Sequence, residues 1–168
     1  MSGPDEFWTH TLALYRRTGV AAACIDLQDR RGADVNLLLY AMWRAVRGDG
    51  ALDGDDFARL DLAVGPWRTT VVERLRAARN AIKSGFDGVA AAEAETLRKA
   101  ILGQEIEGER IAHGILSAVS IAPKPARAAD AAAASLAAYA AHLEFRPDAQ
   151  DRADFQTLIL AAIPAAPA

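Results

Sequence analysis

The chain has 168 residues, of which 52% are hydrophobic and 24% charged, and this composition is typical of a single globular domain with its own core. Its formal net charge of -3 gives no general attraction to nucleic acid or to an anionic membrane, and its one cysteine, Cys24, excludes an intramolecular disulfide. The sequence shows no signal peptide and no apolar stretch long enough to span a bilayer, so we expect a cytoplasmic protein that binds neither nucleic acid nor membrane.

The first half of the chain predicts four helices separated by short breaks. They cover residues 4–17, 20–31, 34–47 and 53–64. Ser2 is a candidate cap for the first, and Gly32 ends the second because glycine readily takes a positive φ. The Gly65-Pro66 pair is expected to close the fourth. The third is the most apolar, with a broad stripe formed by Val35, Leu38, Leu39, Met42, Trp43 and Val46.

The second half predicts four more helices. They cover residues 66–83, 87–119, 128–143 and 148–163. Pro66 suits the first position of a helix, since it lacks only an NH that would be unpaired there. The helix over 87–119 is about three times the average length, so we allow for a kink at Gly103, Gly108 or Gly114. Residues 161–168 are expected to fray.

No segment alternates with strand period for long enough to predict a sheet. The sequence therefore predicts an all-α protein, an irregular single-domain bundle of about seven or eight helices. We expect residues 1–122 to form a helical core. The alanine- and proline-rich residues 123–168 are expected to form a helical extension packed on the same domain, after a stiff Pro-Lys-Pro linker.

Polar residues gather at the turn between the second and third predicted helices. Asp34 is placed to cap the third helix by accepting the backbone NH of Asn36 or Leu37. Gln28 and Asn36 carry amides that can hold a backbone carbonyl, each other or a ligand. Two interpretations stay open: a hydrogen-bonded corner that ties two helices together, or one side of a binding pocket.

Trp67 opens a helix on which basic residues lie close to one angular position. These residues are Arg68, Arg76, Arg79 and Lys83. Guanidinium groups suit phosphates, carboxylates and acidic protein surfaces, so the stripe is a candidate binding face. It can equally be a solvated face, or it can pair with the acids of the next, long helix.

Glu105, Glu109 and His113 stand at four-residue intervals on one face of that long helix. Carboxylate-bridged metal sites in helical bundles use Glu-x-x-His from two helices and a glutamate from two more. Here the spacing is Glu-x-x-x-His and there is one copy, so we expect no metal site and no cofactor. A ladder that faces solvent, or that pairs with the preceding arginines, is the expected structure.

A series of short motifs resembles a known family. The motifs are Phe7-Trp8, Leu14-Tyr15, Gly19-Val20-Ala21, Leu27-Gln28-Asp29, Asp34-Val35-Asn36-Leu37-Leu38-Leu39 and Trp67-Arg68 with Val71-Val72 after it. In this succession the chain is similar to a small proteobacterial family of uncharacterised helical proteins, over residues 7–83 and more loosely up to 119. The resemblance implies no established activity, substrate or cofactor. The segment after residue 123 looks like an extension beyond the family pattern.

The sequence leaves two hypotheses of function open. The first is a binding, adaptor or regulatory protein that holds a protein partner through the basic stripe or through an apolar groove near the tryptophans. It loses its chief support if the arginines are fully paired with Glu105 and Glu109.

The second hypothesis is a small-ligand-binding protein or an enzyme with a pocket at the corner. No motif assigns a catalytic reaction. A small anionic ligand and self-association through the alanine-rich helix are further expectations. The candidate binding residues are Gln28, Asp34, Asn36, Trp43, Trp67, Arg68, Arg76 and Arg79.

Overall fold

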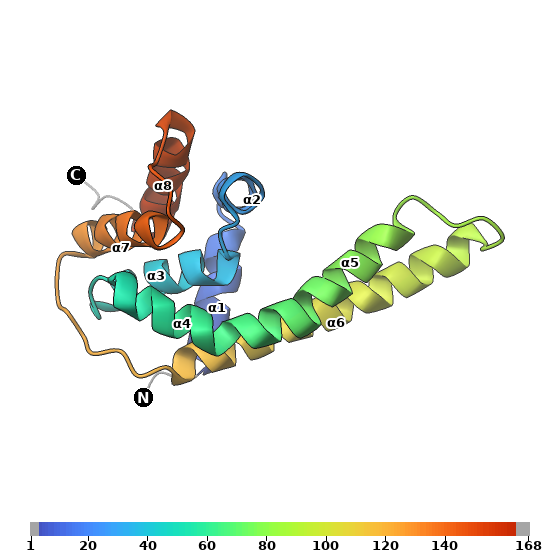
Figure 1. Ribbon diagram of the computed structural model, residues 1–168, viewed down its shortest axis with the longest axis horizontal. Helices are drawn as coiled ribbons and strands as arrows, with labels where there is room; N and C mark the ends of the chain where they lie inside the picture. Colours follow the sequence, from blue (N-terminus) through green and yellow to red (C-terminus); the bar gives the residue numbers. More distant parts are fainter. Residues whose placement is uncertain (1–3, 164–168) are drawn as a thin grey trace.

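The computed structural model describes residues 4–163, which form eight α-helices and one π-helical turn without any β-strand (Figure 1). The elements are α1 (Pro4–Tyr15), α2 (Val20–Arg31), α3 (Val35–Arg47), α4 (Gly54–Trp67), η1 (Arg68–Val72), α5 (Glu73–Ile82), α6 (Ala91–Ala118), α7 (Ala128–His142) and α8 (Ala149–Ala162). The predicted all-α fold and number of helices are confirmed. The Ser2 cap and the fraying of residues 164–168 fall outside the described residues. None of the helices in the described range is both long and apolar enough to cross a membrane.

The helices form a body and a projecting arm. α4, η1 and α5 join into one continuous helical rod that runs beside α6, and the far part of this α5–α6 hairpin extends away from the other helices (Figure 1). α3 lies inside the body, where α7 packs along it. The corner between α2 and α3 lies near the point at which the rod leaves the body (Figure 1).

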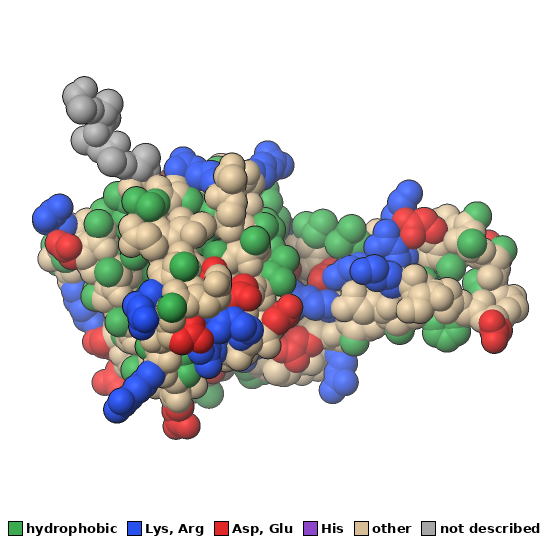
Figure 2. All heavy atoms as spheres, turned by 90° about the horizontal axis from the view of Figure 1, so that it is seen from above, with side chains coloured by type: hydrophobic (Ala, Val, Ile, Leu, Met, Phe, Trp, Pro, Cys, Tyr) green, Lys and Arg blue, Asp and Glu red, His purple; other side chains and the backbone are tan. Residues whose placement is uncertain are grey.

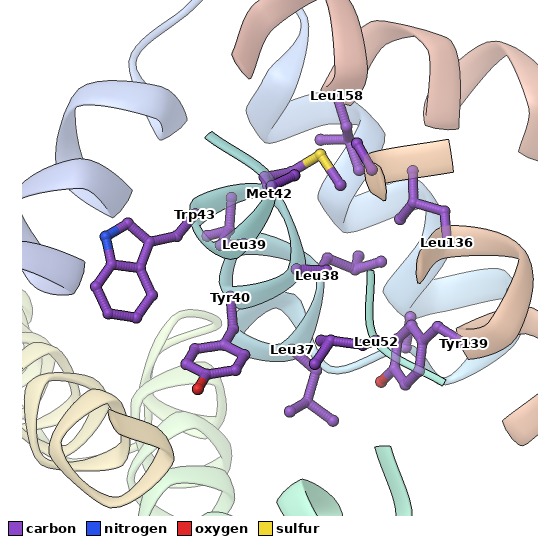
Figure 3. Close-up of a cluster of buried hydrophobic side chains, with 14 of the residues drawn as sticks. Leu37, Leu38, Leu39, Tyr40, Met42, Trp43, Leu52, Leu136, Tyr139 and Leu158 are labelled. Carbon is purple, nitrogen blue, oxygen red and sulfur yellow. The ribbon is translucent and has the colours of Figure 1, made fainter. Parts of the chain in front are cut away.

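The core is centred on α3. All residues from 37 to 45 are buried, including Tyr40 and Arg44, so the helix is enclosed around most of its circumference rather than along one stripe. Leu136 and Tyr139 of α7 and Leu158 of α8 pack into the same cluster (Figure 3). The predicted stripe is too long at its end, because the side chain of Val46 is 44% exposed.

The corner before α3 has the predicted geometry. Gly32 takes a φ of 69°, in the left-handed region, and its NH bonds the carbonyl of Gln28. Asp34 caps α3, because its Oδ1 accepts the NH of Asn36 at 2.8 Å. The corner is also tied to the C-terminal part of the chain, since the NH of Asp34 donates to the hydroxyl of Tyr139 at 2.8 Å.

The predicted helix boundary at Gly65-Pro66 is wrong. The helix continues through Pro66 and then opens into η1, where the NH of Glu73 bonds the carbonyl of Arg68 five residues earlier. Packing against α6 explains why the proline does not end the helix. The indole NH of Trp67 donates to the carbonyl of Gly108 at 2.9 Å, and Val72 is buried. Tertiary contacts thus outweigh the local cost of an interior proline.

The long helix α6 is also shorter and more regular than predicted. It begins at Ala91, after a turn, and its 28 residues contain no break at any glycine. Gly108 is instead a point of close approach between helices, since a Cβ there would lie 3.3 Å from Cγ2 of Val72. The absent side chain allows α6 to pack closely against η1.

An ionic network fastens α8 to α2. Asp151 is fully buried and accepts hydrogen bonds from Arg30 at 2.7 Å and from Arg31 at 2.8 Å. Asp154 lies one turn further along α8, with its carboxyl 3.7 Å from Arg30 and close to Asp26. Burial and the hydrogen bond with Asp26 raise the pKa of Asp154 to about 6.

The raised pKa of Asp154 predicts an unusual dependence of stability on pH. Protonated Asp154 is favoured in the folded state, so its contribution is fully present below the pKa of an unfolded aspartate and is lost as the pH rises through 6. Between pH 7 and pH 5 the free energy of unfolding should rise by about 1 kcal/mol through this group. Urea denaturation should show this rise in the wild type relative to Asp154→Asn. Asp130→Asn, a change on the exposed side of α7, should behave like the wild type. Parallel pH profiles for Asp154→Asn and the wild type would contradict the prediction.

Candidate functional site

A pocket of about 370 Å³ lies at the corner between α2 and α3. The corner forms one wall, η1 and the start of α5 form another, and α6 closes a third. Its lining residues are Gln28, Gly32, Ala33, Asp34, Val35, Asn36, Arg68, Val72, Glu73, Arg76, Glu109 and Ala112. The lining combines apolar side chains with convergent polar and charged groups, and a concave site with convergent polar groups is a candidate for binding a small molecule.

The π turn aims two arginines at this pocket. In an uninterrupted α-helix Arg68 and Arg76 would lie about 80° apart around the helix axis. A π turn adds one residue, which rotates the next part of the helix by about 100° and brings the two side chains to within about 20° of each other. Arg68, Val72 and Arg76 accordingly all line the pocket. Single π turns often occur at functional sites.

Asp34 joins the helix cap to the arginine wall. Its side chain is 7% exposed, and its second carboxylate oxygen accepts from Nη1 of Arg68 at 2.8 Å. The same Nη1 donates to Asp61 of α4, also at 2.8 Å. One carboxylate thus caps α3 and fixes the orientation of a guanidinium on the neighbouring rod.

Asn36 is held by side chains rather than by backbone. Its amide Nδ2 donates to Glu109, and its Oδ1 lies 2.8 Å from Nε2 of His113. Because an amide oxygen only accepts, the hydrogen of His113 is on Nε2. The ring of His113 is fully buried and stacks on Phe7 at 4.0 Å, and burial lowers its pKa to about 4, so it is neutral at pH 7.

The glutamates of α6 pair with the arginines of α5. Arg76 donates to Glu105 at 2.9 Å and to Glu109 at 2.7 Å, and Arg79 donates to Glu105 at 2.5 Å. The arginine-paired form of the predicted ladder is therefore present, and a solvent-facing ladder is not, since Glu105 and His113 are buried. Among residues 4–163, no group of three or more His, Cys, Asp or Glu side chains is placed to hold a metal ion.

Five of the eight sequence-predicted residues meet at the pocket: Gln28, Asp34, Asn36, Arg68 and Arg76. The other three lie elsewhere. Trp43 stacks against Phe7 in the core with ring centroids 5.0 Å apart, and Trp67 bonds the backbone of α6. Arg79 lies one turn beyond the pocket and binds Glu105.

Sequence reasoning did not assign Val72, Glu73 and Glu109 to the pocket. A signal existed for Glu109, because two consecutive antiparallel helices, one with spaced arginines and one with spaced glutamates, should pair. No pattern in the sequence distinguishes Glu73, which reaches the pocket only because the π turn rotates α5.

The helices that surround the pocket lie within the match to a known protein family. The model of a family described as a protein of unknown function (DUF2390) matches residues 6–116, which include every residue that lines the pocket. α7 and α8 lie beyond the match. No curated protein and no solved structure matches the chain. The match spans well over half of the chain, and the protein belongs to this family of unknown function.

Proposed function

We propose that the protein binds a small polar molecule in the pocket at the α2–α3 corner. The observation that carries the proposal is Gln28, whose side-chain amide lines the pocket and has no hydrogen-bond partner among the described residues. The side chains of Asp34, Asn36, Arg68, Arg76 and Glu109 in the lining all make hydrogen bonds within the chain, and Glu73 has a long ionic contact with Arg68. An amide left open in a pocket of this kind is available to a ligand as both donor and acceptor.

Two further features support a ligand-binding pocket. Its shape is fixed by charged hydrogen bonds, so little conformational entropy is lost when a ligand enters. In addition, burial raises the pKa of Glu109 on the pocket wall, and perturbed carboxyl groups in concave sites are enriched at functional positions.

The proposal predicts that Gln28→Ala weakens ligand binding about tenfold, since one hydrogen bond with the ligand is lost. A compound library of amines, carboxylates, sugars and nucleosides is screened by thermal shift on the purified chain, and hits are measured by calorimetry. Gln104→Ala is the matched control, because Gln104 is exposed on the arm and does not line the pocket. Hits that bind equally well to the wild type and to Gln28→Ala would contradict the proposal.

An adaptor role through the basic stripe is less well supported. Arg68, Arg76 and Arg79 each bind carboxylates of their own chain, so they do not form a free basic face. On the face that Figure 2 presents, acidic and basic side chains are interspersed along the arm. The chief support for that hypothesis is thereby removed.

Protein binding nevertheless remains a second candidate, through the end of the arm. Phe86 is 58% exposed and Leu97 is 54% exposed, which is unusual for such large apolar side chains. A pulldown with the wild type and with the double variant Phe86→Ser, Leu97→Ser tests it. A partner that is lost with the double variant supports arm-mediated binding, and an unchanged set of partners argues against it.

Self-association through α7 remains a proposal, and truncation at residue 123 is not a clean test of it. Leu136, Tyr139 and Leu158 belong to the core, so a truncated chain would lose core packing as well as any interface. Light scattering of Ala134→Glu is the better measurement, because Ala134 is on the exposed side of α7.

A further inference from the structure

We infer that the ligand of the corner pocket carries a positive charge, as an alkylammonium or guanidinium group on a short apolar stem. The inference rests on the proposed function, because it specifies the ligand class of the same pocket. Its grounds are the balance of charge around the cavity, the pairing of its arginines with carboxylates and the position of one incompletely paired carboxylate.

Negative charge exceeds positive charge around the pocket. The charged side chains that line it, the carboxylates bonded to its arginines and Arg79, which binds one of these carboxylates, comprise five carboxylates and three guanidinium groups. They are Asp34, Asp61, Glu73, Glu105 and Glu109 on one side, and Arg68, Arg76 and Arg79 on the other. With all eight groups ionised, the surroundings of the cavity attract cations.

The arginines are already engaged, which disfavours an anionic ligand. Nη1 of Arg68 bonds both Asp34 and Asp61 at 2.8 Å. Arg76 spans Glu105 and Glu109 through its Nε and Nη2 atoms. An anion that entered would reach only the guanidinium hydrogens that these carboxylates leave open, and it would face the repulsion of the carboxylates already bound there.

Glu73 is the carboxylate with capacity to spare. It is the first residue of α5 and lines the pocket, and its side chain is 49% exposed. Its only ionic contact among the described residues is a long one, 3.7 Å from Nε of Arg68. A ligand cation can bind it without breaking a short hydrogen bond.

Glu109 supplies a second, inner negative group. Burial raises its pKa, and the carboxylates of Asp34 and Glu105 add to the effect, against the opposing contributions of Asn36 and Arg76. A cation in the pocket would favour the ionised form of Glu109, so binding and ionisation should reinforce each other.

The rest of the wall suits an apolar stem. Ala33, Val35, Val72 and Ala112 line the cavity between the polar groups. A short alkyl chain can contact these side chains, while Gln28 offers its open amide to a further polar group of the ligand. The head group of the ligand would carry its positive charge, and its alkyl stem would contribute apolar contact area with the pocket wall.

Probes that share one stem test the head group directly. Butylammonium, butylguanidinium, butyrate and butyl phosphate are titrated into the ¹⁵N-labelled full chain, and amide chemical shifts are monitored by NMR. Saturable shifts at Gln28, Val35 and Val72 with the two cations, and none with the two anions, are expected. Stronger binding of butyrate or butyl phosphate at the same amides would overturn the inference and leave the proposed function intact.

Glu73→Gln should weaken binding of butylguanidinium about fivefold, since a partly exposed ion pair contributes up to about one kcal/mol. Glu93→Gln is the control, because it removes an exposed carboxylate at the start of α6, away from the pocket. Equal affinity in Glu73→Gln and Glu93→Gln would also overturn the inference. If none of the four probes shifts these amides, the inference is also overturned. The compound library then decides whether the proposed function stands. A neutral ligand whose binding is weakened by Gln28→Ala supports the proposed function, and a library without any hit contradicts both the inference and the proposed function.

Discussion

Replacing Gly50 by alanine is expected to destabilise the protein by about 4 kcal/mol. Gly50 has a φ of 85°, and a Cβ built on it would lie only 1.6 Å from the carbonyl oxygen of Lys124. That overlap is with backbone, so no side-chain rotation relieves it. The linker between α6 and α7 would have to leave its place beside Gly50, where the NH of Lys124 bonds Asp49 at 2.8 Å.

Gly48→Ala provides the matched control for this steric effect. Gly48 also has a left-handed φ, of 81°, but a Cβ there would have no neighbour within 4 Å. Its cost should be about 1 kcal/mol, from the backbone conformation alone. Urea denaturation of both variants measures the difference, and similar losses would show that the contact with the linker contributes little.

Replacing Asn36 by alanine is expected to cost about 3 kcal/mol. The change removes the donor to Glu109 and the acceptor for Nε2 of His113. His113 is fully buried, so water does not replace its lost bond without a penalty, whereas Glu109 lies on the pocket wall with its side chain 22% exposed and keeps its bond with Arg76. Because Asn36 also lines the pocket, binding of the ligand should weaken in the same variant.

Asn80→Ala distinguishes this network from a general effect of losing an asparagine. Asn80 is exposed on α5 and does not line the pocket, so its replacement should change the free energy of unfolding by less than about 0.5 kcal/mol. Chemical denaturation compares the two variants. A loss in Asn36→Ala no larger than in Asn80→Ala would show that the Asn36 network is not stabilising.

The backbone geometry of the corner between α2 and α3 could be predicted from residues that are neighbours in the sequence. Gly32 and Asp34 act through backbone conformation and through a bond to an NH two residues away, so neighbouring residues decide their roles. The partners of Asn36 could not be predicted in the same way, because Glu109 and His113 lie more than 70 residues further along the chain.

Pro66 shows the opposite case. Its local preference predicts a helix boundary, and the structure has a continuous rod, because Trp67 and Val72 are held against α6. The adjoining π turn decides which face of α5 meets the pocket. Arg68 and Arg76 could be proposed as a pair from sequence, but Glu73 could not.

The sequence by itself determined the helical class, most helix ends and the capped corner, because periodicity, glycine and capping residues act over a few positions. It also indicated some of the charged residues of the site, since pairing between arginines on one helix and glutamates on the next is one of the interpretations that the sequence leaves open. Only the tertiary structure decided that these groups enclose a pocket with excess negative charge. The packing of α6 against η1 sets the rotation of α5, and this depends on contacts between residues distant in the chain.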